Sequence, residues 1–496
     1  MFSTIFSLCF VFFGILFMLP GILKARKRHW SEALVRIVLT LISGVITFVL
    51  TSIFVPMITE AILEPITSSL NGSDLEGLLT ELPSAKDALL LVMSLVVTPV
   101  FFLVVFVILK FILLVSFSRL LAKLSLKIAG KIAKKDFVGN NFDKKKPKKF
   151  SPLSAALGAL CGFLGFFILL IPIVETTLTV AVVGKTVASK GVFYEVSDGF
   201  QNNVATYVVH PVGAPVWAGL TRDAESGDKI YIEKEALFIT SFVTGLSEIS
   251  SGNQATVRKS AETFRSTGAL IEKTTFVPRF CAEFINAANG HWNKGEDFAG
   301  ISRPKLSMGN SDIMETFLDC LNNSTTETMK VDLAVMMNVL AVIAENAKLD
   351  DGAIDMSSIL EDKAIISKFS VELLQSPRLA PAMNTFVKNQ MEASNSYIEL
   401  PDQDSEEYKE LVSNIGSRYM AAIKGSAMNE DTLDNLATAV GEALAENGVE
   451  LEEHEHVAIA STLYAEFGDT DNLTDEEVAE FIEQYRRENP DLGVEA

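Results

Sequence analysis

The chain has few of the residues on which most catalytic and disulfide-bonded sites depend. Its 496 residues include four cysteines, five histidines and three tryptophans. Cysteines so few and so irregularly spaced do not make a disulfide framework, and scattered histidines leave little material for a metal centre. His29, His210 and His291 are isolated, and we expect them to pack or lie on the surface. No spacing assembles a Ser/His/Asp or Cys/His group, so we expect neither an enzyme nor a cofactor.

The four cysteines divide between two parts of the chain. Cys9 and Cys161 fall in long apolar stretches, where a small side chain needs no special role. Cys281 and Cys320 lie in a more polar part and could pair across about 40 residues. A single pair at arbitrary spacing is weak evidence for a disulfide.

Three short patterns resemble known sites, but each fails on a required feature. Gly184-Lys-Thr186 resembles the end of a phosphate-binding loop, yet Thr179 stands where the first glycine belongs. Residues 469–475 resemble a calcium loop without its glycine, and Thr474 to Glu477 instead fits a capping box that opens a helix over 478–486. Glu453-His-Glu-His456 offers metal-ligand types in a row, but adjacent positions diverge around a helix, so we expect a solvated charged loop or the start of a helix.

Four long apolar stretches dominate the N-terminal part of the chain. They cover residues 1–20, 34–58, 88–117 and 154–174, and the last can be extended to Val183. At ~1.5 Å per residue, each is long enough to cross a hydrocarbon core of about 30 Å. The first could instead be a cleaved signal peptide, but its positive charges follow the apolar run and do not precede it. The sequence therefore predicts a four-helix membrane region over 1–183.

The loops between these stretches alternate in charge. Lys24, Arg26, Lys27 and Arg28 follow the first stretch, and residues 118–153 after the third hold eleven basic residues. The loop between the second and third stretches carries six acidic residues against Lys86 alone. Because Lys and Arg are retained in the cytoplasm, the first and third loops are predicted inside. The N-terminus and everything after residue 174 are then predicted outside.

The remainder of the chain is strongly acidic. Residues 1–174 carry a net charge of +9, whereas residues 175–496 carry −29. A surface this acidic is repelled by nucleic acid, which we therefore exclude as a partner. The simplest interpretation of this excess of Asp and Glu is that it keeps this part of the chain soluble.

Basic residues recur directly after the third span. Arg119, Lys123, Lys127, Lys131 and Lys134 stand three or four positions apart, with leucine and isoleucine between them. This pattern predicts a basic amphipathic helix over 118–135 on the membrane surface, although the span could simply continue as a cytosolic helix. With the polybasic run at 143–149, it predicts that residues 118–149 contact anionic lipids of the inner leaflet of the bilayer.

Small residues mark the start of the fourth span. Gly158 and Gly162 form a GxxxG pair, and Gly165 follows them. Small residues at this spacing let two helix backbones approach closely. We expect these glycines to pack against another helix, either within the chain or in a homo-oligomer formed through the fourth span.

Charged residues within the spans are rare. Arg36 lies near the cytoplasmic start of the second span, where its side chain can reach water. Lys110 is the candidate intramembrane polar residue, because seven largely apolar residues follow it. If the membrane part of the third span ends near Lys110, the Lys110 amine lies at the membrane interface and has a structural role only. A transporter usually needs several facing polar groups near mid-membrane, and the sequence shows few.

This order of segments resembles the colicin V production protein family, a group of small bacterial inner-membrane proteins. The resemblance is carried by Lys24 to Phe54, by Arg119-Leu-Leu-Ala-Lys123 and by Leu157 to Gly165, and it ends near residue 180. The family usually has a glycine after the basic pair of its first loop, where this chain has His29-Trp30. The resemblance implies a non-enzymatic role in toxin production or export, or in envelope homeostasis, and provides no catalytic residues.

From residue 233 onward, apolar residues recur at helical spacing. They include Ala236, Leu237, Ile239, Phe242 and Leu246, then Ile313, Phe317 and Leu318, then Leu333, Met336, Met337, Leu340 and Ile343. We predict an acidic helical domain over 233–496, in two bundles divided near 394–403. Residues 184–232 contain several prolines and glycines and are predicted to form an irregular connector. The expected fold class is all-α.

The sequence thus predicts an integral protein of the bacterial cytoplasmic membrane whose role is not enzymatic. One alternative is a receptor or scaffold whose acidic domain binds a wall component or a protein outside the cell. A second is a small-solute transporter. A third is a hydrolase in the outer domain, which would require a pocket with convergent carboxylates or histidines.

Overall fold

The computed structural model describes residues 2–25, 30–68, 81–132, 152–187, 191–221, 227–298, 300–303, 307–308, 311–350, 353–354, 357–383, 404–424, 426–448, 451–468 and 472–488, with the single residues 79, 401 and 470. Almost all of the regular structure in these ranges is helical. The predicted all-α fold class is confirmed. Two compact units divide the chain: one contains residues 1–240 and 273–276, and the other contains the rest.

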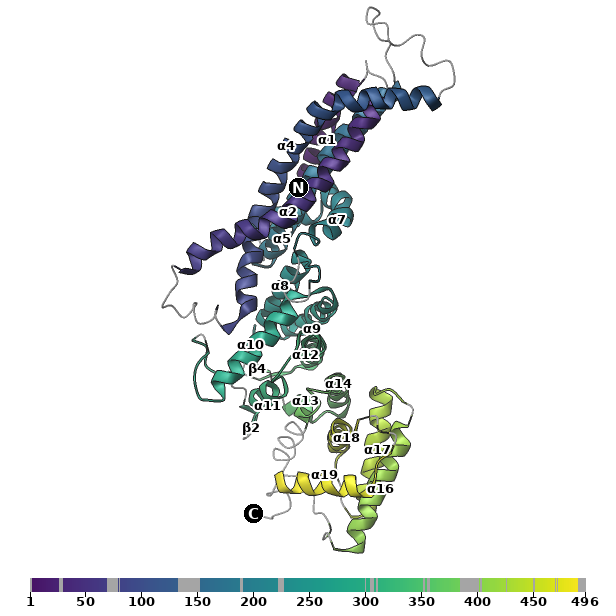
Figure 1. Ribbon diagram of the computed structural model, residues 1–496. Coiled ribbons are helices and arrows are strands. Elements are labelled where there is room, and N and C mark those ends of the chain that lie inside the picture. Colours follow the sequence, from purple (N-terminus) through teal and green to yellow (C-terminus); the bar gives the residue numbers. More distant parts are fainter. Residues whose placement is uncertain are drawn as a thin grey trace, which may run out of the picture. The chain divides into compact units, whose positions relative to one another are not determined.

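Four long helices form most of the first unit (Figure 1). They are α1 (Phe2–Ala25), α2 (Trp30–Ser68), α4 (Pro83–Ile132) and α5 (Pro152–Val187). Each contains a segment long and apolar enough to cross a membrane, which confirms the four predicted apolar helices. α4 continues unbroken to Ile132, so most of the segment predicted as a separate amphipathic helix is the end of the third helix.

The surfaces of these helices are sorted as in a bundle surrounded by lipid. Large apolar side chains point outward, and Val45, Val96 and Phe111 are 65%, 67% and 68% exposed. Small residues lie at the contacts between helices. An added Cβ at Gly158 would collide with the backbone carbonyl of Gly21 in α1, and one at Gly162 would collide with the carbonyl of Phe17. Close backbone packing of α1 on α5 therefore requires these glycines.

Two further helices complete the first unit and correct the prediction of an irregular connector over 184–232. They are α6 (Val192–Gln201) and α7 (Val204–Trp217), and both pack on α1 and α5. Asn203 caps α7, since its side chain accepts a hydrogen bond from the amide of Thr206 at 3.1 Å. Pro211 and Pro215 lie inside α7. The prolines that indicated irregular structure are thus accommodated in a short helix.

The second unit is also helical. It begins within α8 (Ile232–Ile249) and continues through these elements: α9 (Gln254–Gly268), η1 (Ile271–Lys273), α10 (Phe276–Trp292), α11 (Ile313–Cys320), α12 (Thr326–Asn346), α13 (Ser357–Leu360), α14 (Lys363–Leu373), α16 (Glu406–Ile423), α17 (Glu430–Glu446), α18 (Glu453–Phe467) and α19 (Asp475–Glu488). Two antiparallel hairpins of two-residue strands, β1 (Ser307–Met308) with β2 (Ser311–Asp312) and β3 (Leu349–Asp350) with β4 (Ala353–Ile354), interrupt them.

Several local predictions for this unit are confirmed. The helical periodicities from residues 236, 313 and 333 correspond to α8, α11 and α12. The Thr474 hydroxyl and the Glu477 carboxylate form the predicted capping box, and α19 begins at Asp475. Cys281 and Cys320 are free thiols, as are Cys9 and Cys161. Most of the predicted division near 394–403 lies outside the described residues.

Candidate functional site

The first unit holds a buried acid paired with a histidine. Glu175 lies in α5, inside the apolar segment 152–185, and its side chain is 3% exposed. The carboxylate oxygens lie 3.0 and 3.2 Å from Nδ1 of His210 in α7. Ionisable groups buried in an apolar helix are costly and are usually retained for a function. This pair is therefore the leading candidate site.

Close packing of α7 on α5 brings the two side chains together. Val209 is fully buried against Ile171 and Val174 of α5. One turn further along α7, an added Cβ at Gly213 would lie 2.7 Å from a carboxylate oxygen of Glu175. Glycine at this position thus leaves room for the carboxylate beneath α7.

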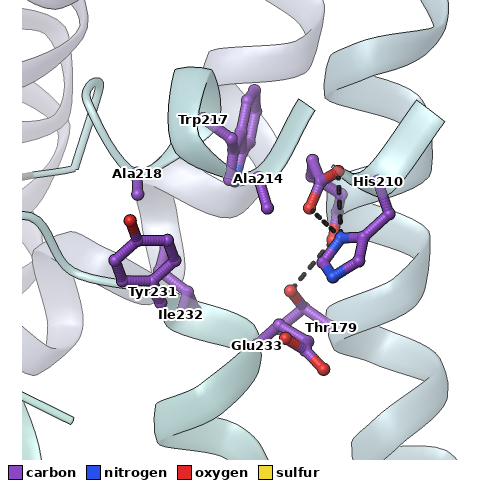
Figure 2. Close-up of a pocket in the computed structure, with 9 residues that line it drawn as sticks. Thr179, His210, Ala214, Trp217, Ala218, Tyr231, Ile232 and Glu233 are labelled. Atoms are coloured by element: carbon purple, nitrogen blue, oxygen red, sulfur yellow. Dashed lines mark hydrogen bonds and ion pairs between the residues drawn. The ribbon is translucent and has the colours of Figure 1, made fainter. Parts of the chain in front are cut away.

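A small cavity adjoins the pair (Figure 2). Its volume is about 10 Å³, and its walls include Thr179, Trp217, Tyr231 and Glu233. Such a volume is close to what one water molecule requires. The indole Nε1 of Trp217 is buried and has no hydrogen-bond partner in the described part of the chain. One water between this indole and the acid would satisfy both groups.

His210 is partly shielded, with 25% of its side chain exposed, whereas its partner carboxylate is almost fully buried. Its Nδ1 lies within hydrogen-bond distance of both oxygens of Glu175, so the ring can donate a proton to either of them. Glu233 lines the adjoining cavity and adds a second carboxylate to the surroundings of the ring. The arrangement can hold a proton between an imidazole and a carboxylate in a water-poor setting.

A second polar contact lies at Lys110. Its amine is 5.5 Å from the centroid of the Phe106 ring, and an added Cβ at Gly165 of α5 would collide with it. The same Cβ would lie 3.8 Å from the Thr40 methyl group of α2. Lys110 is thus directed between helices, and the apolar segment of α4 continues beyond it to Phe117. Among the described residues it has no carboxylate partner.

Hydroxyl groups line one side of α2. Thr40, Ser43, Thr47, Thr51 and Thr59 are all buried. Ser43, Thr47 and Thr59 donate to the carbonyl four residues earlier, which is common where helices pack in apolar surroundings. Thr51 has no partner within the described ranges.

The register of α2 on α5 relates this stripe to the acid. The Thr40 hydroxyl is 3.5 Å from Cys161 Sγ, and an added Cβ at Gly44 would lie 3.2 Å from Ile168. The order of these two contacts along each chain shows that the helices run parallel. Glu175 lies seven residues beyond Ile168 in α5.

The predicted site residues are placed as follows. Gly158 and Gly162 pack on α1 within the chain, whereas Gly165 faces Lys110. Arg119, Lys123, Lys127 and Lys131 belong to the last turns of α4. Lys134 lies outside the described residues. Contact of this segment with anionic lipid stays a prediction.

The acidic and histidine run at 453–456 opens α18, which confirms the helix start that was one of the two expectations, but only part of it is solvated. His454 and Glu455 are buried, and Glu455 accepts a hydrogen bond from the Glu452 amide at 2.7 Å as part of a capping box. Glu453 lies 3.4 Å from Lys363. Within the described residues, no group of three His, Cys, Asp or Glu side chains could hold a metal ion.

An open groove of about 320 Å³ lies beside this helix start, lined in part by Glu442, Glu453 and His456. It has the residue types that a hydrolase would require. However, Glu442 pairs with Arg418 and Glu453 with Lys363, and the two acidic side chains are 65% and 78% exposed. Both carboxylates are thus hydrated and paired with a cation, whereas the general acid of a hydrolase lies in a desolvated pocket.

The Glu175–His210 pair does not follow from the predictions made on the sequence. The bound of the fourth apolar stretch at Val174 leaves Glu175 outside it, although the stretch can be extended to Val183, and His210 is predicted to be isolated. Two signals were available: apolar residues continue from Leu178 to Val183, which places Glu175 inside the helix, and the stretch Val204 to Trp217 contains no Asp, Glu, Lys or Arg. A histidine in such a stretch needs a buried partner.

Comparison of the chain with protein-family models, with curated proteins and with solved structures finds no match. The resemblance to the colicin V production family therefore rests on the sequence segments quoted above.

Proposed function

We propose that this chain is an integral protein of the bacterial cytoplasmic membrane with a non-enzymatic role in maintaining the cell envelope or in toxin-related export. Its N-terminus and its acidic helical domain lie on the extracytoplasmic side. That domain contacts a protein or a wall component, and the basic segment 118–149 contacts anionic lipids inside.

One observation carries this proposal: four apolar helices expose their large side chains and pack internally through small ones. Such surfaces are stable in lipid and not in water. The basic loops at 24–28 and 118–149 and the acidic loop at 60–87 supply the orientation.

Accessibility in intact cells tests the orientation. Single cysteines are placed in a variant without the native cysteines, at residue 74 in the acidic loop, at 140 in the basic loop and after residue 470. A membrane-impermeant maleimide should label positions 74 and 470 in intact spheroplasts, and position 140 only after lysis. Labelling of position 140 alone in intact spheroplasts would reverse the topology and overturn the proposal.

Crosslinking and deletion test the role. Photo-crosslinking from exposed positions of α16 and α17 in growing cells should capture a protein or a wall fragment. A deletion strain should become sensitive to detergents or lose toxin export, and the full chain should restore the wild-type behaviour. A deletion without effect on the envelope or on export argues against this role.

A second candidate function, a transporter whose small solute is the proton itself, is favoured by Glu175, His210 and Lys110. Lys110 is directed between helices, Glu175 and His210 pair within the first unit, and protonatable residues inside apolar helices are typical of proton-coupled carriers. The probe is the proton itself. Vesicles containing the full chain and a pH-sensitive dye should take up protons when a membrane potential is applied.

Under this second proposal, Glu175→Gln should slow proton uptake about tenfold or more, because it removes the group that exchanges the proton. Glu453→Gln, which changes an exposed carboxylate of the second unit, is the matched control. Uptake by the wild-type chain no faster than that of protein-free vesicles would rule out proton transport.

A further inference from the structure

The outward face of α7 is apolar. Val204, Tyr207, Val208, Pro211 and Val212 are exposed there, Tyr207 to 67% and Val212 to 54%. These positions follow the spacing i, i+3, i+4, i+7 and i+8, which places them on one side of a helix. The opposite side packs on α5 and α1 through Ala205 and Val209.

α7 is therefore apolar on both sides. Its 14 residues include no Asp, Glu, Lys or Arg. Its one histidine faces Glu175 on α5 and not the surroundings. A helix that is apolar all round belongs in a protein core or in a membrane, and one whole side of α7 is not covered by the described part of this chain.

The depth of α7 along α5 can be measured from Lys185. Lys185 and Asp198 of α6 form an ion pair of 2.7 Å at the charged end of α5. Val209 packs against Ile171 and Val174, which lie three to four helical turns before Lys185 in the same helix. At ~1.5 Å per residue, Val209 lies about 16–21 Å along α5 from that charged end. The chain thus returns along α5 into its apolar part.

The apolar face of α7 lies beside that of α1. The amide of Val204 donates a hydrogen bond to the Ser7 hydroxyl of α1 at 3.1 Å, so the two helices meet at this level. Leu8 and Phe12, one and five residues further along α1, are 64% and 62% exposed. Whatever surrounds α1 at this depth also reaches α7.

We propose that α6 and α7 enter the bilayer as a re-entrant pair, and that lipid acyl chains cover the exposed face of α7. The inference rests on the proposal that α1, α2, α4 and α5 cross a membrane, but not on their orientation. α6 leaves the interface at the Lys185–Asp198 ion pair, and α7 lies among the acyl chains of the adjoining leaflet. There α7 separates the Glu175 carboxylate from lipid.

Spin labelling of the full chain in phosphatidylcholine–phosphatidylglycerol liposomes tests this. The four native cysteines are replaced, and single cysteines carrying a nitroxide are introduced by Val208→Cys and Val212→Cys. Val45→Cys, on the exposed face of α2, is the lipid-facing control, and Glu453→Cys, at an exposed position of the second unit, is the water-facing control. Collision rates with oxygen and with a nickel chelate are compared, because oxygen concentrates in lipid and the chelate stays in water.

Labels at 208 and 212 should show oxygen and chelate collision rates in the range of the Val45 label. Chelate rates like those of the Glu453 label would overturn the inference, and so would low rates with both reagents, which indicate cover by protein. If the Val45 label also meets the chelate, the membrane-spanning proposal itself fails, so the two failures can be told apart. Val204→Cys supplies the same measurement if either variant does not fold.

Discussion

Removing either Glu175 or His210 leaves the remaining residue without its buried partner, which is unfavourable. A buried carboxylate without a partner retains its desolvation cost, and breaking such a pair costs more than replacing both members with apolar residues. The pair of His291 and Glu296 offers a natural comparison, because its nitrogen and oxygen lie 3.3 Å apart but the carboxylate is 61% exposed.

His210→Ala should therefore lower the free energy of unfolding of the purified protein by about 3 kcal/mol. His291→Ala is the matched control and should cost less, because its partner stays hydrated. The double variant Glu175→Leu/His210→Leu should recover most of the loss. Thermal unfolding in detergent measures all three, and equal losses for His210→Ala and His291→Ala would contradict the role given to burial.

His456 makes the second unit sensitive to acid. Its ring packs on Gly441, where an added Cβ would lie 2.5 Å from Nδ1. Burial lowers the pKa of His456, while Glu453 and Glu455 raise it and Lys363 and His454 lower it through charge. The unfolded state therefore takes up a proton at a higher pH than the folded state does.

Stability carried by His456 is complete well above its ordinary pKa of about 6.5 and is lost as the pH falls through that value. The unfolding temperature should drop between about pH 7.5 and about pH 5.5, and the drop should be smaller in His456→Leu. Scanning calorimetry at the two pH values checks this. An identical drop in both proteins would show that other groups bind the protons.

Among the elements, α1 and α5 show what close backbone packing requires. Gly162 lies directly against the Phe17 carbonyl, whereas an added Cβ at Gly14 would be 3.5 Å from the Phe166 ring, an ordinary contact. The two glycines belong to the same interface and differ only in what lies opposite them.

Gly162→Ala should destabilise the bundle by about 1–3 kcal/mol, because the helices must move apart. Gly14→Ala should be neutral or slightly stabilising, since alanine favours a helix more than glycine does. Detergent unfolding of the two variants provides the comparison. A loss in Gly14→Ala as large as in Gly162→Ala would place the tight contact elsewhere.

The long elements were predictable because apolar periodicity and length leave few alternatives. The four apolar helices and α8, α11, α12 and α19 all follow from such patterns. α6 and α7 escape prediction because the prolines and glycines of residues 184–232, Pro211 and Pro215 among them, are typical of irregular structure. Proline only removes a donor and fixes φ, and a short helix tolerates this when its carbonyls are otherwise satisfied. Glu175 escapes prediction because a charged residue usually marks the end of a span, although the apolar residues allow an extension to Val183. Its pairing with a residue 35 positions later also cannot be deduced from local spacing.

At the scale of the whole molecule, the imbalance of charge is the main feature. Residues 175–496 carry a net charge of −29, and most of them lie outside the apolar helices. Like charges repel one another in the folded state, and salt weakens this repulsion once the screening length falls below their spacing.

Raising sodium chloride from about 0.02 M to about 0.5 M should therefore raise the unfolding temperature. Choline chloride at equal ionic strength should act alike, since screening does not depend on the cation. Calcium chloride, matched in ionic strength, is the control for a specific site. Additional stabilisation by calcium would reveal a cation site that the described residues do not show.

The pairing of Glu175 with His210 also constrains the order of assembly in the cell. The histidine emerges from the ribosome 35 residues after the acid. Under the proposal that α5 crosses a membrane, it inserts during that interval with an uncompensated carboxyl group, at a cost of about 2.5–3.5 kcal/mol when the group is charged. The carboxyl must then be neutralised by a proton or sheltered by the insertion machinery until the later segment folds back. The fourth span is thus completed only after α7 has been synthesised.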